Sequence, residues 1–116
     1  MRSSFAARVQ EYVRCHLRDP DLNPAKIAEA NGVSLRGLYT LYESLGISLE
    51  QSIIQQRLDG ARTDLAAPNQ RYTSIAATAR AWGITNPTFL SNRFRQEYGI
   101  TPRQWRAGSR LKGSRR

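Results

Sequence analysis

Apolar side chains recur at helical spacing along most of the chain, and we predict no β-strand. The pattern is clear within residues 3–18, whose apolar members fall on one helical face: Phe5, Val9, Tyr12, Val13 and Leu17. Asp19-Pro20-Asp21 ends this helix, because proline interrupts the backbone hydrogen bonding. The chain is therefore predicted to be all-α.

Start and stop signals divide the rest of the chain into further helices. Asn23-Pro24 and Asn86-Pro87 each place a capping side chain before a proline, which suits the first helical position. Thr73 or Ser74 is expected to cap another helix, and Gly46 suits a helix C-terminus. The seven predicted helices cover about residues 3–18, 24–31, 35–45, 49–66, 74–82, 87–98 and 102–105.

The longest predicted helix, residues 49–66, lies in the middle of the chain. Ser48 and Gln51 form a capping-box pattern at its start. Gly60 lies inside it, where glycine costs about 1 kcal/mol relative to alanine. Its apolar stripe consists of Leu49, Ile53, Ile54, Leu58, Ala61 and Leu65. Because the segments on both sides need an apolar partner, we expect this helix to share its stripe between them and to fix their relative orientation.

Two stretches repeat one pattern around Gly32 and Gly83, which lie 51 residues apart. Each has an alanine four residues before the glycine, a β-branched residue and Ser or Thr after it, and then an apolar pair at i, i+4. The other matching residues are Ala28, Val33, Ser34, Leu38 and Tyr42 in the first copy and Ala79, Ile84, Thr85, Leu90 and Phe94 in the second. Glycine suits a tight turn that needs positive φ, and the small alanine lets two helices approach closely. The pattern is typical of a helix-turn-helix, although one copy alone would also fit an ordinary helical hairpin.

These elements predict an all-α fold of two helix-turn-helix subdomains joined by a long linker helix. The first subdomain covers residues 1–47, the linker helix 48–66 and the second subdomain 67–107. Residues 108–116 contain four Arg or Lys and two Gly, and we expect them to form a disordered basic tail. A chain of 116 residues can bury one modest core, or two small cores that share a helix.

Charge is distributed unevenly along the chain, whose formal net charge is +9. Residues 1–58 contain 7 Lys and Arg against 6 Asp and Glu, whereas residues 59–116 contain 11 against 3. A basic half suggests a polyanionic partner, for which nucleic acid is the default candidate. Charge alone would equally fit a well-solvated basic surface, so the nucleic-acid interpretation depends on the repeated motif.

Several classes of function find no support in the sequence. His16 is the sole histidine, and its neighbour Cys15 points in a different direction on a helix, so the two do not form a catalytic pair. Cys15 is also the sole cysteine, which leaves no disulfide framework and no cysteine metal site. The sequence has no Gly-rich phosphate loop, no membrane-length apolar run and no signal-peptide pattern. We therefore expect no enzyme activity, no cofactor, no metal and no membrane partner, and a cytoplasmic, nucleoid-associated protein.

Residues 5–107 resemble the DNA-binding domain of bacterial AraC/XylS-type transcription regulators. The resemblance is most specific in the second half, at Gly83-Ile84-Thr85, Phe89-Leu90-Ser91, Phe94-Arg95, Tyr98-Gly99-Ile100-Thr101-Pro102 and Trp105-Arg106. The first half is similar at Gly32-Val33-Ser34-Leu35-Arg36, Leu38, Leu41-Tyr42, Gly46, Arg57-Leu58 and Ala61-Arg62. The chain departs from the family pattern at Thr40, Thr78, Ile84 and Asn92. Thr40 and Asn92 lie on faces that should meet bases, so these departures bear on the DNA sequence recognised.

The resemblance implies a regulator of transcription that binds double-stranded DNA at a promoter or operator, with RNA polymerase as a further partner. Family members commonly carry an N-terminal effector-sensing or dimerisation domain, which this chain does not include. We expect the chain to be a domain excised from a longer regulator rather than a small stand-alone member.

Helical spacing and the resemblance together indicate which residues read bases, since a recognition helix presents its N-terminal half and one stripe to the major groove. The candidate base readers are Arg36, Tyr39, Thr40, Thr88 and Asn92. Arg36 suits guanine O6 and N7, and Asn92 suits adenine N6 and N7. Arg36 could instead contact phosphate, and Tyr39 could instead be a half-buried core aromatic.

Polar and basic residues near these helices are candidates for the phosphate contacts that position the protein on DNA. They are Ser34, Arg71, Thr85, Asn86, Ser91, Arg93, Arg95 and Arg103. Two recognition helices on one rigid monomer would enter successive major grooves, about 34 Å apart, and read an asymmetric site. The alternative function is a protein-interaction module that docks polymerase or another regulator domain and has only nonspecific DNA affinity. RNA is a third candidate ligand, but no aromatic stacking platform is evident.

Overall fold

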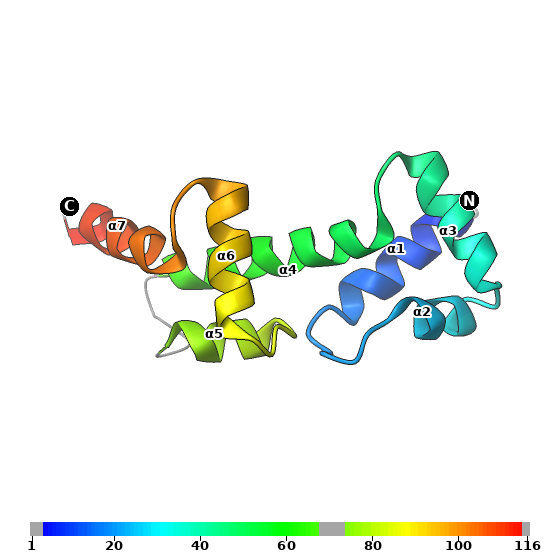
Figure 1. Ribbon diagram of the computed structural model, residues 1–116, viewed down its shortest axis with the longest axis horizontal. Helices are drawn as coiled ribbons and strands as arrows, with labels where there is room; N and C mark the ends of the chain where they lie inside the picture. Colours follow the sequence, from blue (N-terminus) through cyan, green and yellow to red (C-terminus); the bar gives the residue numbers. More distant parts are fainter. Residues whose placement is uncertain (1–3, 68–73, 115–116) are drawn as a thin grey trace. The chain divides into compact units, whose positions relative to one another are not determined.

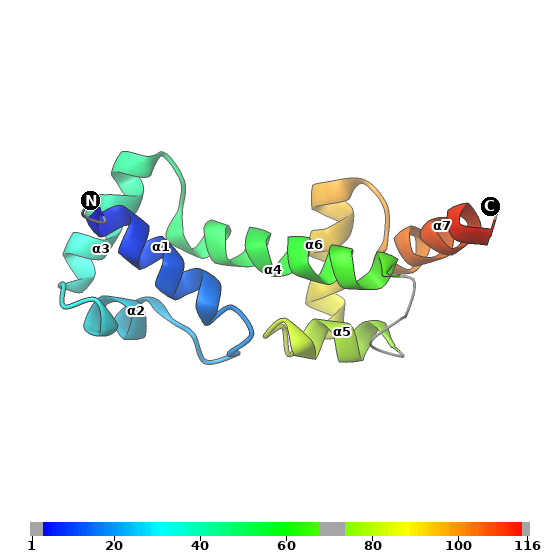
Figure 2. The same cartoon turned by 180° about the vertical axis from the view of Figure 1, so that it is seen from behind.

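The computed structural model describes residues 4–67 and 74–114, of which 109–114 are described by their backbone alone. The described residues form seven α-helices and no strand, as the apolar pattern predicts (Figures 1 and 2). The helices are α1 (Phe5–Cys15), α2 (Pro24–Ala30), α3 (Leu35–Leu45), α4 (Leu49–Ala66), α5 (Ile75–Ala81), α6 (Pro87–Tyr98) and α7 (Pro102–Ser114).

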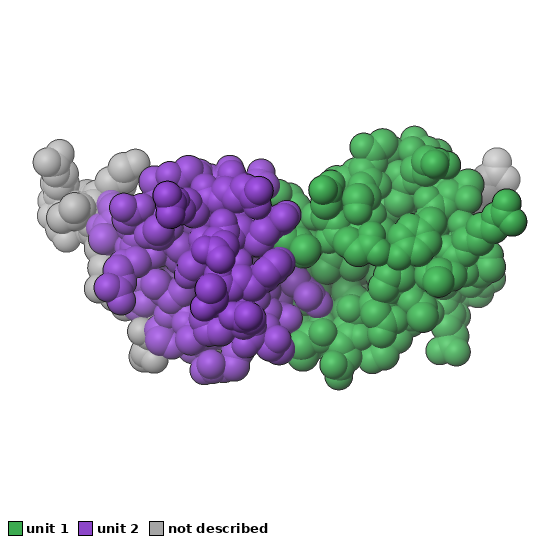
Figure 3. All heavy atoms as spheres, in the orientation of Figure 1, with its two compact units in different colours: residues 1–56 green, residues 57–116 purple. Residues whose placement is uncertain are grey.

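The chain forms two compact units, residues 1–56 and 57–116, which Figure 3 colours separately. We call them unit 1 and unit 2. Their boundary falls inside α4, so the buried Leu49 and Ile53 belong to unit 1, whereas Leu58, Ala61 and Leu65 belong to unit 2. One apolar stripe therefore contributes to two small cores, as its unbroken helical spacing predicts.

Each unit buries the apolar residues that the repeated pattern places toward its core. Unit 1 also buries Val9, Val13, Leu17, Leu22, Ile27, Ala28, Leu38 and Tyr42. Unit 2 also buries Thr78, Ala79, Ile84, Leu90, Phe94 and Pro102. Thr78 is compatible with this core because its hydroxyl donates a hydrogen bond to the Ser74 carbonyl at 3.0 Å. A buried hydroxyl that has a partner costs little, so this core accommodates threonine.

Side-chain caps start the helices at the predicted residues. The Asn23 side chain accepts a hydrogen bond from the Lys26 amide at 2.9 Å, and Ser74 accepts one from Ala77 at 3.0 Å. Ser48 likewise accepts from the Gln51 amide at 3.3 Å. Each cap satisfies an amide that has no partner within the first helical turn.

The last helix is longer than the sequence analysis predicts. We expected a short helix through Trp105 and a disordered tail from residue 108, but α7 continues to Ser114; residues 115 and 116 lie outside the described part. A reciprocal capping box that we had not identified starts this helix. The Gln104 side chain accepts from the Thr101 amide at 2.9 Å, while the Thr101 hydroxyl accepts from the Gln104 amide at 3.1 Å.

Within the described residues, no helix is long and apolar enough to cross a membrane.

Gly60 is the point at which α4 meets Trp82 in unit 2. A Cβ atom at Gly60 would lie 2.5 Å from the Trp82 Cη2 atom and 2.6 Å from two further indole carbons. The indole is held there because its Nε1–H donates to the Asp64 carboxylate at 2.8 Å. Glycine therefore makes room for the ring, in addition to the local helical cost that its sequence position predicts.

Candidate nucleic-acid interface

The two repeats form turns with the same backbone hydrogen bonds. The Val33 amide donates to the Ala28 carbonyl at 3.0 Å, and the Ile84 amide donates to the Ala79 carbonyl at 2.9 Å. The glycines before them have φ of 69° and 79°. This is the Schellman arrangement that ends a helix, and it connects α2 to α3 and α5 to α6 (Figures 1 and 2). Both predicted helix-turn-helix motifs are thus present.

The second turn is one residue longer than the first. Ser34 caps α3 by accepting from the Gly37 amide at 3.0 Å, and Asn86 caps α6 by accepting from the Thr88 amide at 2.9 Å. These caps are 52 residues apart, whereas the glycines are 51 apart, because Thr85 is an additional residue in the second turn. Aligning the caps makes Arg36 and Thr40 equivalent to Thr88 and Asn92, in that order.

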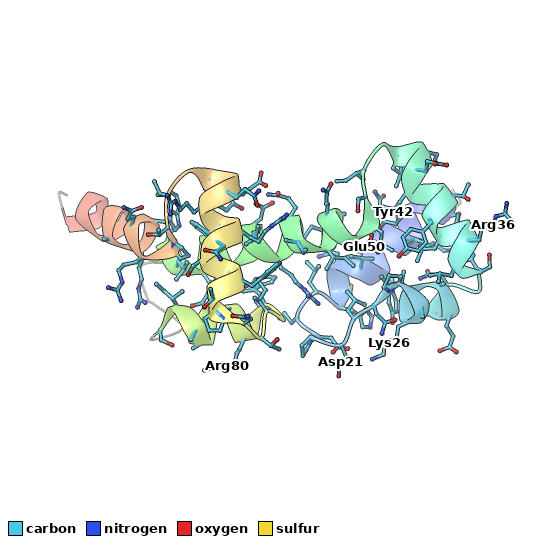
Figure 4. The ribbon with its side chains drawn as sticks, viewed as in Figure 1. Asp21, Lys26, Arg36, Tyr42, Glu50 and Arg80 are labelled. Carbon is cyan, nitrogen blue, oxygen red and sulfur yellow. The ribbon has the colours of Figure 1, made fainter. Side chains whose placement is uncertain are left out.

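The equivalent base-reading candidates form an exposed pair on each second helix. Arg36 and Thr40 are four residues apart on α3, and both are exposed; Figure 4 shows Arg36 pointing away from the ribbon. Thr88 and Asn92 are likewise exposed on α6. Residues four apart are neighbours on a helix surface, so each pair forms one continuous polar strip.

Tyr39 is exposed beside this strip, but its hydroxyl already has a partner. The ring is 40% exposed, and the hydroxyl donates to the Glu50 Oε2 atom at 2.5 Å. This hydrogen bond raises the pKa of Tyr39 and lowers the pKa of Glu50. The sequence analysis missed Glu50, because its position depends on how the start of α4 packs beside α3. With 40% of its surface exposed, Tyr39 lies at the surface but is still more than half covered.

The predicted phosphate contacts differ in their accessibility. Thr85, Arg95 and Arg103 are exposed, whereas Ser91 and Arg93 are partly buried on α6. Arg103 lies on α7, outside the helix-turn-helix motif. The eighth candidate, Arg71, lies outside the described residues.

Charge separates the two units more sharply than it separates the two halves of the sequence. Residues 1–56 contain six Lys and Arg against six Asp and Glu, so unit 1 is formally neutral. Residues 57–116 contain twelve against three, so unit 2 carries the whole net charge of +9. An anionic polymer is therefore attracted mainly by unit 2.

Two further features of unit 2 lie outside our assignment of site residues. Phe89 is 38% exposed on α6, although the core needs only its neighbours Leu90 and Phe94. Its position outside that apolar pair is a sequence signal for a surface role.

The Arg62 guanidinium lies 4.8 Å from the centre of the Tyr98 ring and 4.7 Å from that of Trp105. This stacking joins α4, α6 and α7, and it depends on tertiary contacts that spacing does not reveal.

The chemical groups at the two motifs suit binding to nucleic acid. Among the described residues, no group of three or more His, Cys, Asp or Glu is placed to hold a metal ion. What the two motifs provide is a helix N-terminus with an exposed polar strip, a combination that suits contact with the phosphates and base edges of nucleic acid.

Comparison with known proteins identifies the family. A family model described as a helix-turn-helix domain matches residues 27–108. The transcriptional activator NphR from Rhodococcus sp is 30% identical over 105 residues, which cover 90% of this chain but 30% of NphR. The chain thus spans less than a third of that relative's length.

Solved structures share the fold over nearly the whole chain. The DNA-binding domain of AdpA, a global transcriptional factor crystallised with a target DNA, matches with a TM-score of 0.84 and 26% identity over 95% of this chain and 96% of that one. An AraC-type regulator from Chromobacterium violaceum matches with a TM-score of 0.77 and 28% identity over 87% and 88% of the two chains. The chain belongs to the AraC-type family of helix-turn-helix DNA-binding transcription regulators.

Proposed function

We propose that the chain binds double-stranded DNA sequence-specifically by inserting the N-terminal halves of α3 and α6 into successive major grooves. The observation that carries this proposal is that both units have the same backbone hydrogen bond at the turn and an exposed polar pair at equivalent positions of the following helix. Two readers on one chain address two groove segments about 34 Å apart, and their different side chains make the site asymmetric. Bending of the DNA to meet both helices would cost about 1–6 kcal/mol.

The readers have different chemistry. Arg36 can donate two hydrogen bonds to guanine O6 and N7, which discriminates against other bases by about 1–3 kcal/mol. Asn92 can bond adenine N6 and N7, while Thr40 and Thr88 add a hydroxyl or methyl contact. Because Glu50 already accepts the Tyr39 hydroxyl, Tyr39 meets DNA through its ring, which suits a thymine methyl.

Phosphate contacts position these readers. Ser34 and Asn86 lie at helix N-termini, where amide groups and the helix dipole favour an anion. The remaining proposed contacts are in unit 2: Arg71, Thr85, Ser91, Arg93, Arg95 and Arg103. Since unit 2 holds the net positive charge, we propose that it supplies most of the nonspecific affinity and that unit 1 contributes mainly discrimination.

The chain would be one part of a longer regulator, whose other parts and partners complete its function. NphR is named a transcriptional activator, and by analogy we propose that this chain is the DNA-binding part of a bacterial regulator that works in the cytoplasm. Its further partners would be RNA polymerase and an N-terminal effector or dimerisation domain. The chain acts by binding and does not itself catalyse a reaction.

Selection of bound duplexes from a random DNA pool tests this function. We expect an asymmetric motif of about two helical turns. Arg36→Ala should relax one half of the motif and Asn92→Ala the other, whereas Arg8→Ala on α1 and Gln96→Ala on the C-terminal half of α6 should leave it unchanged. A motif confined to one groove would contradict the two-reader model. Failure to enrich any motif would favour a protein-interaction module with nonspecific DNA affinity.

A further inference from the structure

A shallow cleft of about 450 Å³ lies in unit 1, where α3 ends and α4 begins. Tyr39 and Glu43 of α3, Ile47 and Ser48 of the connecting turn and Glu50 of α4 contribute to its walls. Figure 4 labels Glu50 and another lining residue, Tyr42. The cleft exists because Gly46 ends α3 with a φ of 77°, which turns the chain sharply into the start of α4.

The cleft carries two carboxylates and no compensating cation. Glu43 and Glu50 both line it, and its lining includes no Lys, Arg or His. Within the described part of the chain, no ion pair joins Glu43 or Glu50 to a cation. Glu50 is held in place by hydrogen bonds from the Tyr39 hydroxyl at 2.5 Å and the Ser48 hydroxyl at 3.3 Å. Two such charges repel DNA phosphate and attract a cationic group.

Two exposed apolar side chains, Tyr39 and Ile47, line the cleft, and Leu45 lies two residues before Ile47 in the chain. Tyr39 is 40% exposed, Leu45 40% and Ile47 43%. These are three of the six large apolar side chains that are exposed among the described residues, and they lie within nine positions of one another. Such a concentration is more typical of a protein-binding surface than of a solvated face.

We propose that this cleft docks a segment of a protein partner that carries an apolar side chain beside a Lys or Arg. The apolar side chain would pack on Ile47 and the Tyr39 ring, and the cation would lie between Glu43 and Glu50. An apolar anchor flanked by a charge pair is the usual composition of a small protein interface. The cleft shares the Tyr39 ring with the proposed DNA contact, but its carboxylates and Ile47 lie at and beyond the C-terminal end of α3, away from Arg36.

Two synthetic peptides of equal length test the charge complementarity. One alternates Leu and Arg and the other alternates Leu and Glu, and fluorescence anisotropy measures their binding to the full chain in the absence of DNA. We expect the Leu/Arg peptide to shift the backbone amide NMR signals of Gly46, Ile47 and Ser48. The Glu43→Gln/Glu50→Gln variant should weaken this binding at least fivefold, and Ile47→Ser should also weaken it.

The matched control is Glu29→Gln/Glu97→Gln, which removes the same charge from exposed positions outside the cleft. This control should bind the Leu/Arg peptide within twofold of the unmodified chain. An equal loss in both double variants, or signal shifts centred elsewhere in unit 1, would overturn the proposal. DNA binding by Ile47→Ser should persist, because Ile47 has no part in the proposed DNA contacts, so a failure of peptide docking is distinguishable from a failure of DNA recognition.

Discussion

Replacing Gly60 with alanine should destabilise unit 2, although the same change stabilises most helices. In an exposed helix interior, Gly→Ala contributes about 0.8–1.0 kcal/mol of stability. Here the new Cβ atom would lie 2.5–2.6 Å from three Trp82 ring carbons, roughly 1 Å inside the optimal separation of carbon atoms. Withdrawal of the ring would disturb its hydrogen bond to Asp64.

The expected net effect follows from these opposing contributions. Overpacking of this kind costs about 1–3 kcal/mol, and a hydrogen bond to a charged group is worth about 1.5–3 kcal/mol. After subtraction of the helical gain, Gly60→Ala should lower the free energy of unfolding by up to about 2 kcal/mol. Gly108→Ala is the matched control, because a Cβ atom there would meet nothing within 4 Å beyond the adjacent backbone of its own helix. It should leave stability unchanged or raise it by up to about 1 kcal/mol.

Urea unfolding monitored by tryptophan fluorescence measures this effect in the correct unit, since both tryptophans, Trp82 and Trp105, belong to unit 2. In a Trp82→Leu background the clash is absent, and Gly60→Ala should then be neutral or stabilising, with Trp105 as the probe. The reasoning is refuted if Gly60→Ala alone is as stable as the unmodified chain. It is also refuted if the loss persists without Trp82.

Three further results are expected. Arg95→Ala should make the slope of log K for DNA binding against log salt concentration shallower by about 0.9, because one phosphate contact is lost. Gln96→Ala is the control and should not change the slope. If Arg95→Ala and the unmodified chain have equal slopes, Arg95 does not contact phosphate. Burial and the hydrogen bond to Asp59 raise the pKa of Tyr98 well above its ordinary value. The stabilisation that comes from the neutral Tyr98 hydroxyl is therefore complete below about pH 10. It is lost as pH rises further, because Tyr98 ionises at lower pH in the unfolded chain than in the folded one. Tyr98→Phe should cost about 1 kcal/mol at pH 8, and urea unfolding at pH 8 and 11 should show this difference narrowing; a constant difference would contradict the assignment. Finally, Tyr39→Phe should raise the Glu50 pKa toward its ordinary value, because the hydrogen bond from the hydroxyl is removed. NMR of the Glu50 carboxyl carbon measures this pKa. An unchanged pKa in the variant would show that the hydrogen bond is absent in solution.

Local signals were sufficient to predict most of the fold. The turn glycines Gly32 and Gly83 and the capping residues Ser34 and Asn86 each satisfy a requirement of the backbone within a few residues. The predicted length of α7 was wrong because the basic, glycine-containing composition of residues 108–116 favoured a disordered tail, and the capping signal at the start of the helix was overlooked. The reciprocal bonds of Thr101 and Gln104 provide a nucleus, and elongation from a formed nucleus is much easier than initiation.

Contacts that join separate helices were beyond the reach of spacing, and they alter the interpretation of individual residues. The sequence shows only that Gly60 weakens its helix. The structure shows that the missing Cβ atom leaves room for the Trp82 ring. Tyr39 has the position of a base reader, yet its hydroxyl is committed to Glu50 across the turn after α3. That contact links two surfaces with opposite electrostatic preference: the polar strip of Arg36 and Thr40, which suits DNA, and the carboxylate cleft, which repels it. A partner that displaced the Tyr39 hydroxyl from Glu50 would free this side chain on the DNA-reading helix, so occupation of the cleft and the choice of DNA sequence should be coupled.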